Sequence, residues 1–381
     1  MQIFKDGIAT KRTPLHDAAQ EGHLDIVKFL IEDEGGDSSC HDIYQATPLH
    51  FASLNGHLNI IKYLITKQKC DTECQNVYGV TPILLAALNG HLELVKYLVL
   101  EKSCDPISRT EDCNTPLHAA LCNGHLEVVR FLISTMNCDP IVPGFEGMTP
   151  LHYAIHSGNI NLVRYLIEDV KCNLHALDNF NRTPTMIAVK SLPCLQYLCE
   201  KHCDPTSRTI LGETMLHFAA REGRHEIIDF LVKECYFDPN TPGWTSRAPL
   251  HYAAECGHLD LLKHLISKYN CQATIADANG DTPLHFAALQ GHLPIVKHLT
   301  LDLNCDPLQT DNYGNTPLHD AARNGHLEVV KFLIETLCCP TDTKGSCHMT
   351  PLEWAFFKGH FHIIKYLCQA NTKMISSELN H

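Results

Sequence analysis

The sequence predicts an all-α solenoid, a stack of short helix–turn–helix units, and three observations lead to this fold class. The tetrapeptide Thr-Pro-Leu-His occurs intact six times, and five altered copies lie in register with it. Successive copies start 34 residues apart, except for one step of 31 residues. Each copy is followed by two segments with apolar residues at helical spacing. A fixed period of this length is typical of a stacked array of one repeated unit.

The eleven units define the expected organisation of the chain. They begin at Thr13, Thr47, Thr81, Thr115, Thr149, Thr183, Thr214, Ala248, Thr282, Thr316 and Thr350. We expect the array to cover residues 13–370, with a partial N-terminal finger or cap at 1–12 and a polar C-terminal tail at 371–381. A solenoid grows by adding units and has no single core to outgrow, so this length need not form several domains.

The fourth unit illustrates the elements expected in each copy. The hydroxyl of Thr115 is suited to cap a first helix, and Pro116 suits the first helical position. Gly124 is expected to end that helix, because positive φ is common just past a helix C-terminus. A second, apolar helix should run from about His125 to a Cys-Asp-Pro sequence that cannot continue it. The polar stretch that follows returns the chain to Thr149 as an extended turn.

The sixth unit differs from the others. It is three residues short, and Ser191-Leu192-Pro193 replaces the usual Gly-His pair. We expect Ser191 or Leu192 to precede its second helix, with Pro193 in the first turn. Because the neighbouring units have full length, we expect the array to be weakest or to bend here. The fifth unit is regular except that Asn159 replaces the His after Gly.

The pattern Thr-Pro-Leu-His-x-Ala-Ala-x-x-Gly-His-Leu-x-Val-Val resembles the ankyrin repeat family. It is nearly complete at residues 13–27, 282–296 and 316–330. The resemblance implies a curved all-α solenoid with β-hairpin-like fingers on one edge. It also implies binding of other proteins through the finger tips and the exposed side of the first helices. The period of 34 is one longer than usual, and the extra residue lies at the end of the second helix.

Charge and hydropathy exclude several classes of partner. The formal net charge is −13, whereas proteins bind phosphate backbones mainly through Lys and Arg. We therefore expect no nucleic acid partner and no attraction to anionic membranes. No apolar run approaches the roughly 20 residues of a membrane span, so we expect no membrane insertion. Residues 1–10 lack the basic and apolar regions of a signal peptide. We expect a monomer.

The 19 cysteines are interpreted as thiols, with a disulfide framework as the alternative. Eight of them repeat at one position: Cys70, Cys104, Cys138, Cys172, Cys203, Cys271, Cys305 and Cys339. Packed helices lie about 8–10 Å apart, which is too far for a disulfide between neighbours in this column. Cysteine would then act as a small buried apolar residue in a reducing compartment.

Sixteen of the 26 histidines form two repeated columns. Eight end the tetrapeptide: His16, His50, His118, His152, His217, His251, His285 and His319. Eight others follow Gly: His23, His57, His91, His125, His258, His292, His326 and His360. Because each unit fills the same positions, we interpret these residues as neutral, hydrogen-bonded imidazoles of the fold rather than as metal ligands.

The strongest candidate ligands for a metal are Cys194, Cys199, His202 and Cys203 in the sixth unit. Their types suit zinc, but their spacing lacks the paired Cys-x-x-Cys signature, and the three cysteines align with core positions. We therefore expect no metal and no cofactor. The sequence also has no Gly-rich phosphate loop, no His-Glu-x-x-His and no nucleophile elbow, so we expect no catalytic residue and no enzyme.

Basic residues recur along the expected second helices and have two interpretations. They are Lys28, Lys62, Lys96, Arg130, Arg164, Lys263, Lys297, Lys331 and Lys365. A basic ridge of this kind would suit an acidic partner. Five of them, however, follow Asp or Glu by three residues, a spacing typical of a solvated helix face with local ion pairs. We favour the solvated face.

Aromatic residues in the fingers are the predicted protein-binding residues, because exposed aromatics dominate protein interfaces. Tyr44, Tyr78, Phe180 and Tyr313 stand three residues before a unit start, and Phe145 and Trp244 stand four before. Local packing of the finger is the alternative. A second aromatic row lies four residues after the start, at Phe51, Tyr153, Phe218, Tyr252, Phe286 and Trp354, where burial between first helices is favoured. We expect the anchor at Phe145, Phe180 and Trp244.

The sequence thus predicts a non-enzymatic scaffold or adaptor that binds a partner protein on its finger rim and first-helix face. We expect it in the cytoplasm, with the nucleus as a second location. The main alternative is the partner-recognition segment of a larger enzyme or channel whose active domain lies outside this chain. A mechanical spacer, which would have no concentrated partner surface, is a third interpretation. The sequence does not identify the partner or the repeats that bind it.

Overall fold

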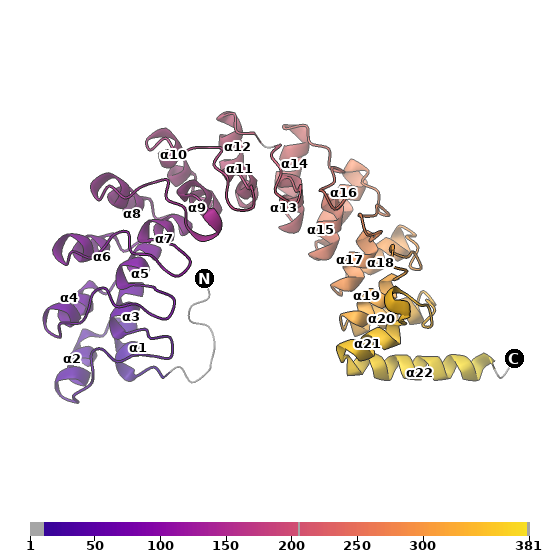
Figure 1. The fold of residues 1–381 in the computed structure, drawn as a ribbon, viewed down its shortest axis with the longest axis horizontal. Helices are drawn as coiled ribbons and strands as arrows, with labels where there is room; N and C mark the ends of the chain where they lie inside the picture. Colours follow the sequence, from indigo (N-terminus) through magenta and orange to yellow (C-terminus); the bar gives the residue numbers. More distant parts are fainter. Residues whose placement is uncertain (1–10, 205, 379–381) are drawn as a thin grey trace. The chain divides into compact units, whose positions relative to one another are not determined.

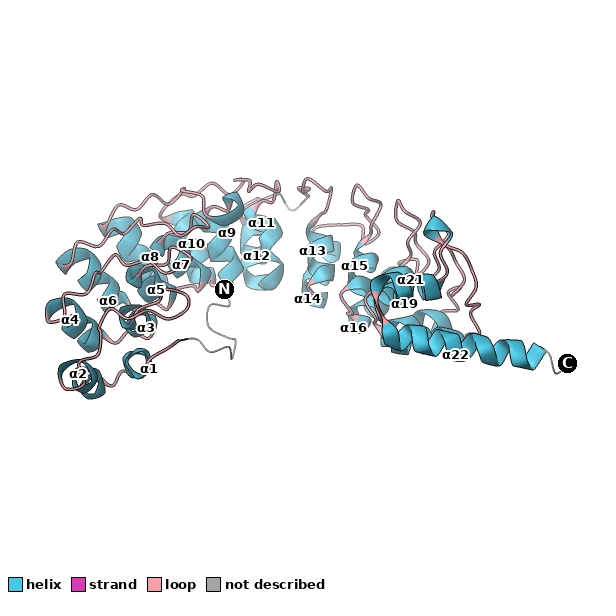
Figure 2. Ribbon diagram, turned by 60° about the horizontal axis from the view of Figure 1, so that its bottom comes forward, coloured by secondary structure: helices cyan, strands magenta, loops and turns pink. Residues whose placement is uncertain are grey.

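The computed structural model describes residues 11–204 and 206–378, and it is all-helical over these residues. They form twenty-two α-helices and six short 3-10 or π-helical segments, with no β-strand among them (Figure 2). The predicted fold class, an all-α solenoid, is confirmed. The expected cap at residues 1–12 lies outside the described residues as far as residue 10. None of the described helices is both long enough and apolar enough to cross a lipid bilayer.

The helices occur in pairs, and each first helix begins one residue after the start of a sequence unit. The first helices are α1 (Pro14–Glu21), α3 (Pro48–Leu54), α5 (Pro82–Leu88), α7 (Pro116–Cys122), α9 (Pro150–Ser157), α11 (Pro184–Ile187), α13 (Met215–Arg221), α15 (Pro249–Glu255), α17 (Pro283–Leu289), α19 (Pro317–Arg323) and α21 (Pro351–Lys358). The second helices are α2 (Leu24–Glu32), α4 (Leu58–Thr66), α6 (Leu92–Lys96), α8 (Leu126–Arg130), α10 (Ile160–Glu168), α12 (Leu192–Glu200), α14 (His225–Lys233), α16 (Leu259–Tyr269), α18 (Leu293–Lys297), α20 (Leu327–Glu335) and α22 (Phe361–Glu378). Residues 371–378, which the sequence analysis assigned to a tail, continue α22.

In three repeats the end of the second helix has the π-helical geometry that accommodates one additional residue. Three second helices continue there as π-helical turns: η1 (Tyr97–Glu101), η2 (Phe131–Thr135) and η5 (His298–Asp302). A π-helical turn holds one more residue than an α-helical turn. The remaining short segments are the 3-10 turns η3 (Phe145–Gly147), η4 (Ala188–Lys190) and η6 (Ser346–His348).

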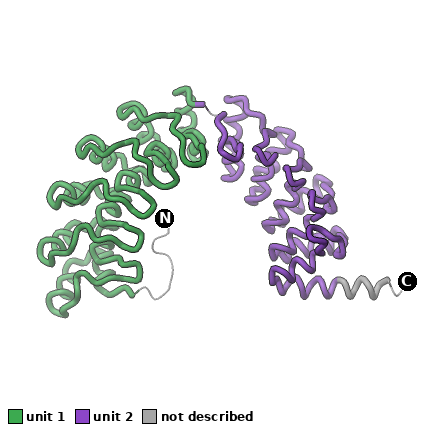
Figure 3. The backbone as a smooth tube through the Cα atoms, in the orientation of Figure 1, with its two compact units in different colours: residues 1–203 green, residues 204–381 purple. Residues whose placement is uncertain are grey.

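The chain divides into two compact units between Cys203 and Asp204 (Figure 3). Unit 1 contains α1 to α12, and unit 2 contains α13 to α22. Within each unit the first helices lie side by side in one row, and the second helices form a parallel row behind them (Figure 1). The core fills the space between the rows with small and branched apolar side chains such as Ala52, Ile61 and Leu98, all fully buried.

The tetrapeptide explains why each first helix begins where it does. In the fourth repeat Thr115 occupies the N-cap position and Pro116 the first helical position, as predicted. The Thr115 backbone N–H donates to Nδ1 of His118, and the Thr115 hydroxyl lies 2.9 Å from the same nitrogen. The other ring nitrogen, Nε2, then carries the proton and donates to the Val142 carbonyl in the next finger, 2.9 Å away. One imidazole therefore accepts a backbone N–H at the start of a helix and links that helix to the finger that leads to the next repeat.

The second histidine column makes a bond in the opposite direction. Nε2 of His57 donates to the Gln20 carbonyl of the preceding repeat at 2.8 Å. The same imidazole lies against Gly22, where a Cβ would stand 2.6 Å from its ring. Six further residues of this column repeat the backward bond: His91, His125, His258, His292, His326 and His360. In the fifth repeat Asn159 substitutes for the histidine and donates from Nδ2 to the Gly124 carbonyl.

All 19 cysteines are free thiols, and most of the repeated column is buried. Cys138 and Cys172 each donate to a carbonyl of the preceding repeat, 3.8 Å from Sγ. Burial raises the pKa of Cys138 to about 11, and that of Cys172 to about 11 as well. These two residues are therefore protonated thiols that pack between repeats.

The sixth repeat has the irregularity that its sequence predicted. Its first helix, α11, has four residues and continues as the 3-10 turn η4. Ser191 takes the N-cap position of α12 and accepts from the Cys194 N–H, and Pro193 lies in the first turn. The first part of the prediction, that Ser191 or Leu192 precedes this helix, is confirmed.

Candidate functional site

The fingers are the tight turns in the loops that lead from a second helix to the next first helix (Figure 2). Short hydrogen bonds hold each finger, and a backbone bond joins some neighbouring fingers. Asp42 shows the local cause, because its Oδ1 accepts from the N–H groups of Tyr44 and Ala46, both at 2.8 Å. Asp and Asn side chains commonly form such turns, because their oxygen accepts from the backbone N–H two residues further on. One backbone bond then joins successive fingers, for example from Val77 N–H to the Tyr44 carbonyl at 2.9 Å.

This turn holds four of the six predicted binding residues. Tyr44, Tyr78, Phe180 and Tyr313 each donate their backbone N–H to an Asp or Asn oxygen two residues earlier, at 2.8 to 2.9 Å. Their side chains are partly or largely exposed. The rings of Tyr44 and Tyr78 stack with centroids 6.2 Å apart. The finger aromatics are thus exposed but have ordered backbones.

Phe145 and Trp244 are held differently. Phe145 donates its N–H to the Tyr153 hydroxyl at 2.9 Å, and its side chain is 44% exposed. Trp244 donates its N–H to the Leu211 carbonyl at 3.0 Å, and its indole lies directly over Gly212. The Trp244 side chain is nevertheless 71% exposed, which makes it the larger apolar surface of the two. Phe145 belongs to unit 1 and Trp244 to unit 2.

The second aromatic row lies mainly inside the structure. Phe51, Tyr153, Tyr252, Phe286 and Trp354 are buried, and Phe218 is half-buried. The favoured interpretation, burial between first helices, therefore fits these residues. The more accessible positions of the first-helix face lie three residues further along each helix. Examples are Leu54, Leu88 and Leu289, which are half-buried. Sequence reasoning missed this row, although a helical step of three from the aromatic positions would have identified it.

The basic residues of the second helices contact aromatic rings of the next repeat. Five of them lie 4.2 to 5.9 Å from such ring centroids: Lys28, Lys62, Arg130, Arg164 and Lys297. Local ion pairs form at Glu93–Lys96 and Glu328–Lys331, at 2.8 and 2.9 Å. These side chains thus make structural contacts on the second-helix face, and several are cation–π contacts that the sequence analysis did not predict.

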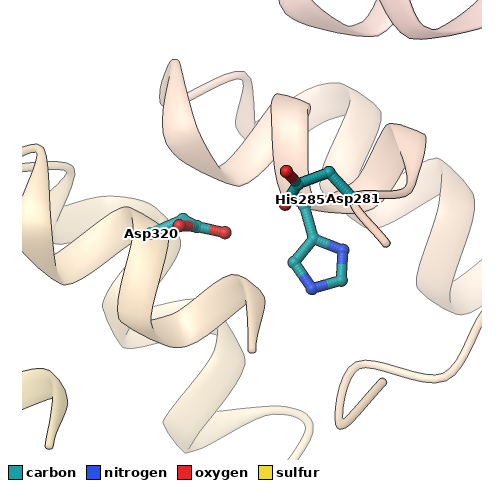
Figure 4. A group of neighbouring side chains, drawn as sticks. All are labelled: Asp281, His285 and Asp320. Atoms are coloured by element: carbon teal, nitrogen blue, oxygen red, sulfur yellow. The ribbon is translucent and has the colours of Figure 1, made fainter. Parts of the chain in front are cut away.

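One cluster of potential metal ligands occurs among the described residues, and it differs from the group of Cys194, Cys199, His202 and Cys203 that the sequence analysis considered. Asp281, His285 and Asp320 place their ligand atoms within 4.8 Å of one another (Figure 4). Both nitrogens of His285 are engaged, because Nδ1 accepts from Thr282 N–H and Nε2 donates to the Asn315 carbonyl. Sequence reasoning missed Asp320, although it is an acid in a column where most other units carry an apolar residue.

Comparison with known families identifies the repeat. The family model described as Ankyrin repeats (3 copies) matches in overlapping segments along nearly the whole chain. The matched residues are 3–76, 49–143, 83–176, 137–209, 170–243, 192–277, 216–311, 250–344 and 295–377. The chain belongs to the ankyrin repeat family. Ankyrin repeats are in general protein–protein interaction modules without catalytic activity of their own.

Solved ankyrin repeat structures include a similar one. The crystal structure of the human ASB11 ankyrin repeat domain aligns with 24% sequence identity and a TM-score of 0.49. The alignment covers 58% of this chain and 97% of the ASB11 chain. No curated protein sequence matches the chain.

Proposed function

We propose that this chain is a non-enzymatic scaffold or adaptor that binds a partner protein on its finger rim and first-helix face. The observation that supports this most directly is the exposure of aromatic side chains on ordered finger backbones. Trp244 is 71% exposed and Tyr313 is 62% exposed, yet both have hydrogen-bonded N–H groups. Rigid aromatics lose little entropy on binding and are the residues most enriched at interface hot spots.

The binding array in this proposal comprises residues 13–370 and acts as a monomer. The six binding residues are Tyr44, Tyr78, Phe145, Phe180, Trp244 and Tyr313. We propose a cytoplasmic location, with the nucleus as a second one, since the many thiols persist as thiols in a reducing compartment.

Trp244→Ala tests the proposal. A partner is first captured by affinity purification with the whole chain and then measured with purified components. We expect the substitution to weaken binding about thirtyfold, on the order of 2 kcal/mol, because a central aromatic anchor is removed. Thermal melting should show that the array remains folded, since most of this indole lies outside the core.

The matched control changes the opposite helix face. Lys96→Glu and Arg130→Glu reverse charges on the second helices and should change affinity little. If a partner binds and these charges matter, whereas Trp244, Phe180 and Phe145 do not, the binding surface lies on the second helices and the proposal is wrong.

A further inference from the structure

A cavity of about 370 Å³ opens between the first helices of the ninth, tenth and eleventh repeats, within unit 2. Its polar wall includes Asp281, Asp311 and Asp320, and its apolar wall includes Phe286 and Trp354. This volume is at the lower end of the range of small-ligand sites and is large enough for one extended side chain. Figure 4 shows the carboxylates of Asp281 and Asp320 facing the space beside His285.

Two polar atoms in this cavity are buried without a hydrogen-bond partner among the described residues. They are Oδ2 of Asp320 and Nε1 of Trp354, on side chains that are only 8% and 9% exposed. An unpaired carboxylate oxygen favours a ligand that donates hydrogen bonds, so Oδ2 of Asp320 indicates a donating ligand, whereas Nε1–H of Trp354 is itself a donor and gives no preference for a cation. Three of the four charged side chains that line the cavity are acidic, and the fourth is Arg323, so the ligand that fits is a cation.

The negative charges of Asp281 and Asp320 are also poorly balanced by positive charges inside the protein. Burial, together with Asp277 and Asp311, raises the pKa of Asp281 to about 6. Burial, together with Asp281 and Asp311, holds the pKa of Asp320 well above its usual range, although Arg323 opposes this shift. A bound cation would relieve this repulsion.

The chain's first repeat shows how the same positions hold a guanidinium. Arg12 stands one residue before the unit start and pairs with Asp17 at 2.6 Å, while its guanidinium lies 4.4 Å from the Phe51 ring centroid. Asp17 and Phe51 occupy the fourth position after the start in successive repeats. Asp320 and Trp354 occupy the same two positions in the tenth and eleventh repeats. The position of Arg12 is there taken by Asn315, which cannot supply the cation.

A second internal guanidinium lies in the repeat that precedes the cavity. Arg247 pairs with Glu255 and lies 4.5 Å from the Tyr252 ring centroid and 4.1 Å from that of Phe286. Phe286 thus has Arg247 against its ring and also lines the cavity. At the next unit start the equivalent of Arg247 is Asp281, so the guanidinium that pairs with an acid in the preceding repeat is replaced by a carboxylate where the cavity occurs.

A divalent metal ion fits this cavity less well. His285 has both ring nitrogens hydrogen-bonded within the fold, which leaves two nearby carboxylates as ligands. Aromatic walls supply no oxygen ligands for a hard cation, whereas they attract a guanidinium over their faces. A planar guanidinium also has donors for two carboxylates at once.

We propose that this cavity, formed by Asp281, Phe286, Asp320 and Trp354, binds the guanidinium group of an arginine side chain from the partner protein. The inference rests on the proposed function, since it supplies one recognition element of the partner. The partner segment would insert one arginine between the first helices, with its charge against Asp281 and Asp320 and its plane against the aromatic rings.

The test uses N-acetyl-arginine methylamide as the probe and Trp354 fluorescence as the readout. The chain has two tryptophans, so Trp244→Phe leaves Trp354 as the single reporter. We expect a saturable fluorescence change in the millimolar range, absent with the neutral isostere N-acetyl-citrulline methylamide. Asp320→Asn in the same background should weaken the probe at least tenfold, a loss of about 1.4 kcal/mol. Asp260→Asn, which removes an exposed acid from α16, is the charge-matched control and should leave probe affinity unchanged.

The folded state of Asp320→Asn is checked by thermal melting. Oδ2 of Asp320 has no hydrogen-bond partner among the described residues, so replacing it by an amide of the same shape removes no hydrogen bond there and should not lower stability at neutral pH. Probe affinity should rise with pH through about 6, because Asp281 must lose its proton to attract the cation. The charged or titratable groups that act on this site are Asp277, Asp281, His285, Asp311, Asp320, Arg247 and Arg323.

Four results would overturn the inference. They are an equal response to the citrulline probe, an unchanged affinity in Asp320→Asn, a response to MgCl₂, CaCl₂ or MnCl₂ with none to the arginine probe, and binding that appears only in Arg323→Gln. The last would mean that Arg323, which stacks 4.8 Å from the Trp354 ring centroid, fills the cavity itself.

If the probe fails while Trp244→Ala still weakens a captured partner, this inference alone is wrong. If the probe binds but no partner depends on the finger aromatics, the proposed surface is wrong and the cavity assignment stands.

Discussion

At the scale of single residues, the motif histidines link the stability of the array to pH. Burial lowers the pKa of His50, His118, His217 and His251 to about 4 in each case, despite their bonds to backbone carbonyls. Nδ1 of each ring accepts the N–H of the residue that caps its own helix. Protonation at Nδ1 would place two N–H groups against each other, so the charged form is disfavoured by geometry as well as by burial.

Acid should therefore destabilise the protein. The folded pKa values lie below the unfolded value of about 6.5, so the stability that these groups supply is present above pH 6.5 and is lost as pH falls toward 4. In this window each such histidine lowers the free energy of unfolding by about 1.4 kcal/mol per pH unit. Asp281 and Asp320 act in the opposite direction, because their folded pKa values are raised, but the motif histidines are more numerous.

Urea denaturation at a series of pH values measures this effect, and His118→Gln is the informative variant. The variant should be less stable at pH 7 yet depend less steeply on pH between about 6.5 and 4.5, because one titrating imidazole is absent. Equal slopes in the two proteins would show that His118 does not contribute to the acid sensitivity.

At the scale of elements, a glycine follows every described first helix except α11, and either one or two constraints require it. Gly90 has φ +75°, and a Cβ there would stand 2.4 Å from Nδ1 of His125 in the next repeat. Gly158 has φ +74°, but the sixth repeat lacks the histidine, and a Cβ would meet only Ser191 at 3.6 Å. The two glycines thus share a backbone conformation and differ in the neighbour they face.

Gly90→Ala and Gly158→Ala form a matched pair that separates these constraints. Both substitutions should cost about 1–2 kcal/mol for the left-handed backbone. Gly90→Ala should cost an additional 1–3 kcal/mol or so, because His125 must move and lose its 3.0 Å bond to the Leu88 carbonyl. Thermal melting of the two variants measures the difference, and equal midpoints would mean that the imidazole contact is not rigid.

The helix pairs were predictable from the sequence because their signals are local. Thr-Pro at a helix start, Gly after its end and Cys-Asp-Pro after the second helix act within a few residues, and even Ser191 in the short repeat could be located. The sequence placed the extra residue of the 34-residue period at the end of the second helix, but it did not predict π-helical turns there, since a run of apolar residues is compatible with α- and π-helical geometry alike. The stacking of Arg130 on Tyr165 was missed because Arg130 also had a suitable partner, Glu127, three residues before it.

The candidate site was predictable in part, because some of its signals are also local in the sequence. The finger aromatics could be recognised by position, but their exposure depends on what each ring covers, as Trp244 covers Gly212. The cluster of Asp281 and Asp320 joins residues in two different columns of successive repeats. Asp320 is an unusual acid in its column, but the sequence does not show that it lies beside Asp281, so only the stacking of two first helices reveals the shared cavity.

At the scale of the whole molecule, the short sixth repeat should divide the cooperativity of unfolding. The two compact units meet in sequence between Cys203 and Asp204, just after α12. Helix α11 has four residues, the fewest of any described α-helix, so few intrahelical bonds protect its amides. Because a solenoid is stabilised by its repeats and their nearest neighbours, one weak repeat lets the flanking segments open separately.

Hydrogen exchange followed by mass spectrometry measures this prediction. We expect the lowest helical protection within residues 183–213, with higher protection in α5 and α7 on one side and in α15 and α17 on the other. Uniform protection from α9 through α15 would rule out a division at this repeat.

The two histidine bonds have a consequence for how the gene can change. His16 bonds a carbonyl 30 residues ahead, just before the next copy starts, and His57 bonds one 37 residues behind, so neither bond reaches beyond an adjacent copy. A tandem duplication of 102 nucleotides, which encodes 34 residues, inside the regular repeats therefore leaves every such offset unchanged. An insertion of another length within a first helix would instead put the next imidazole out of reach of its carbonyl. Recombination between copies can thus lengthen or shorten the array, and with it the stretch of aromatic side chains offered to a partner, while each new junction is already hydrogen-bonded.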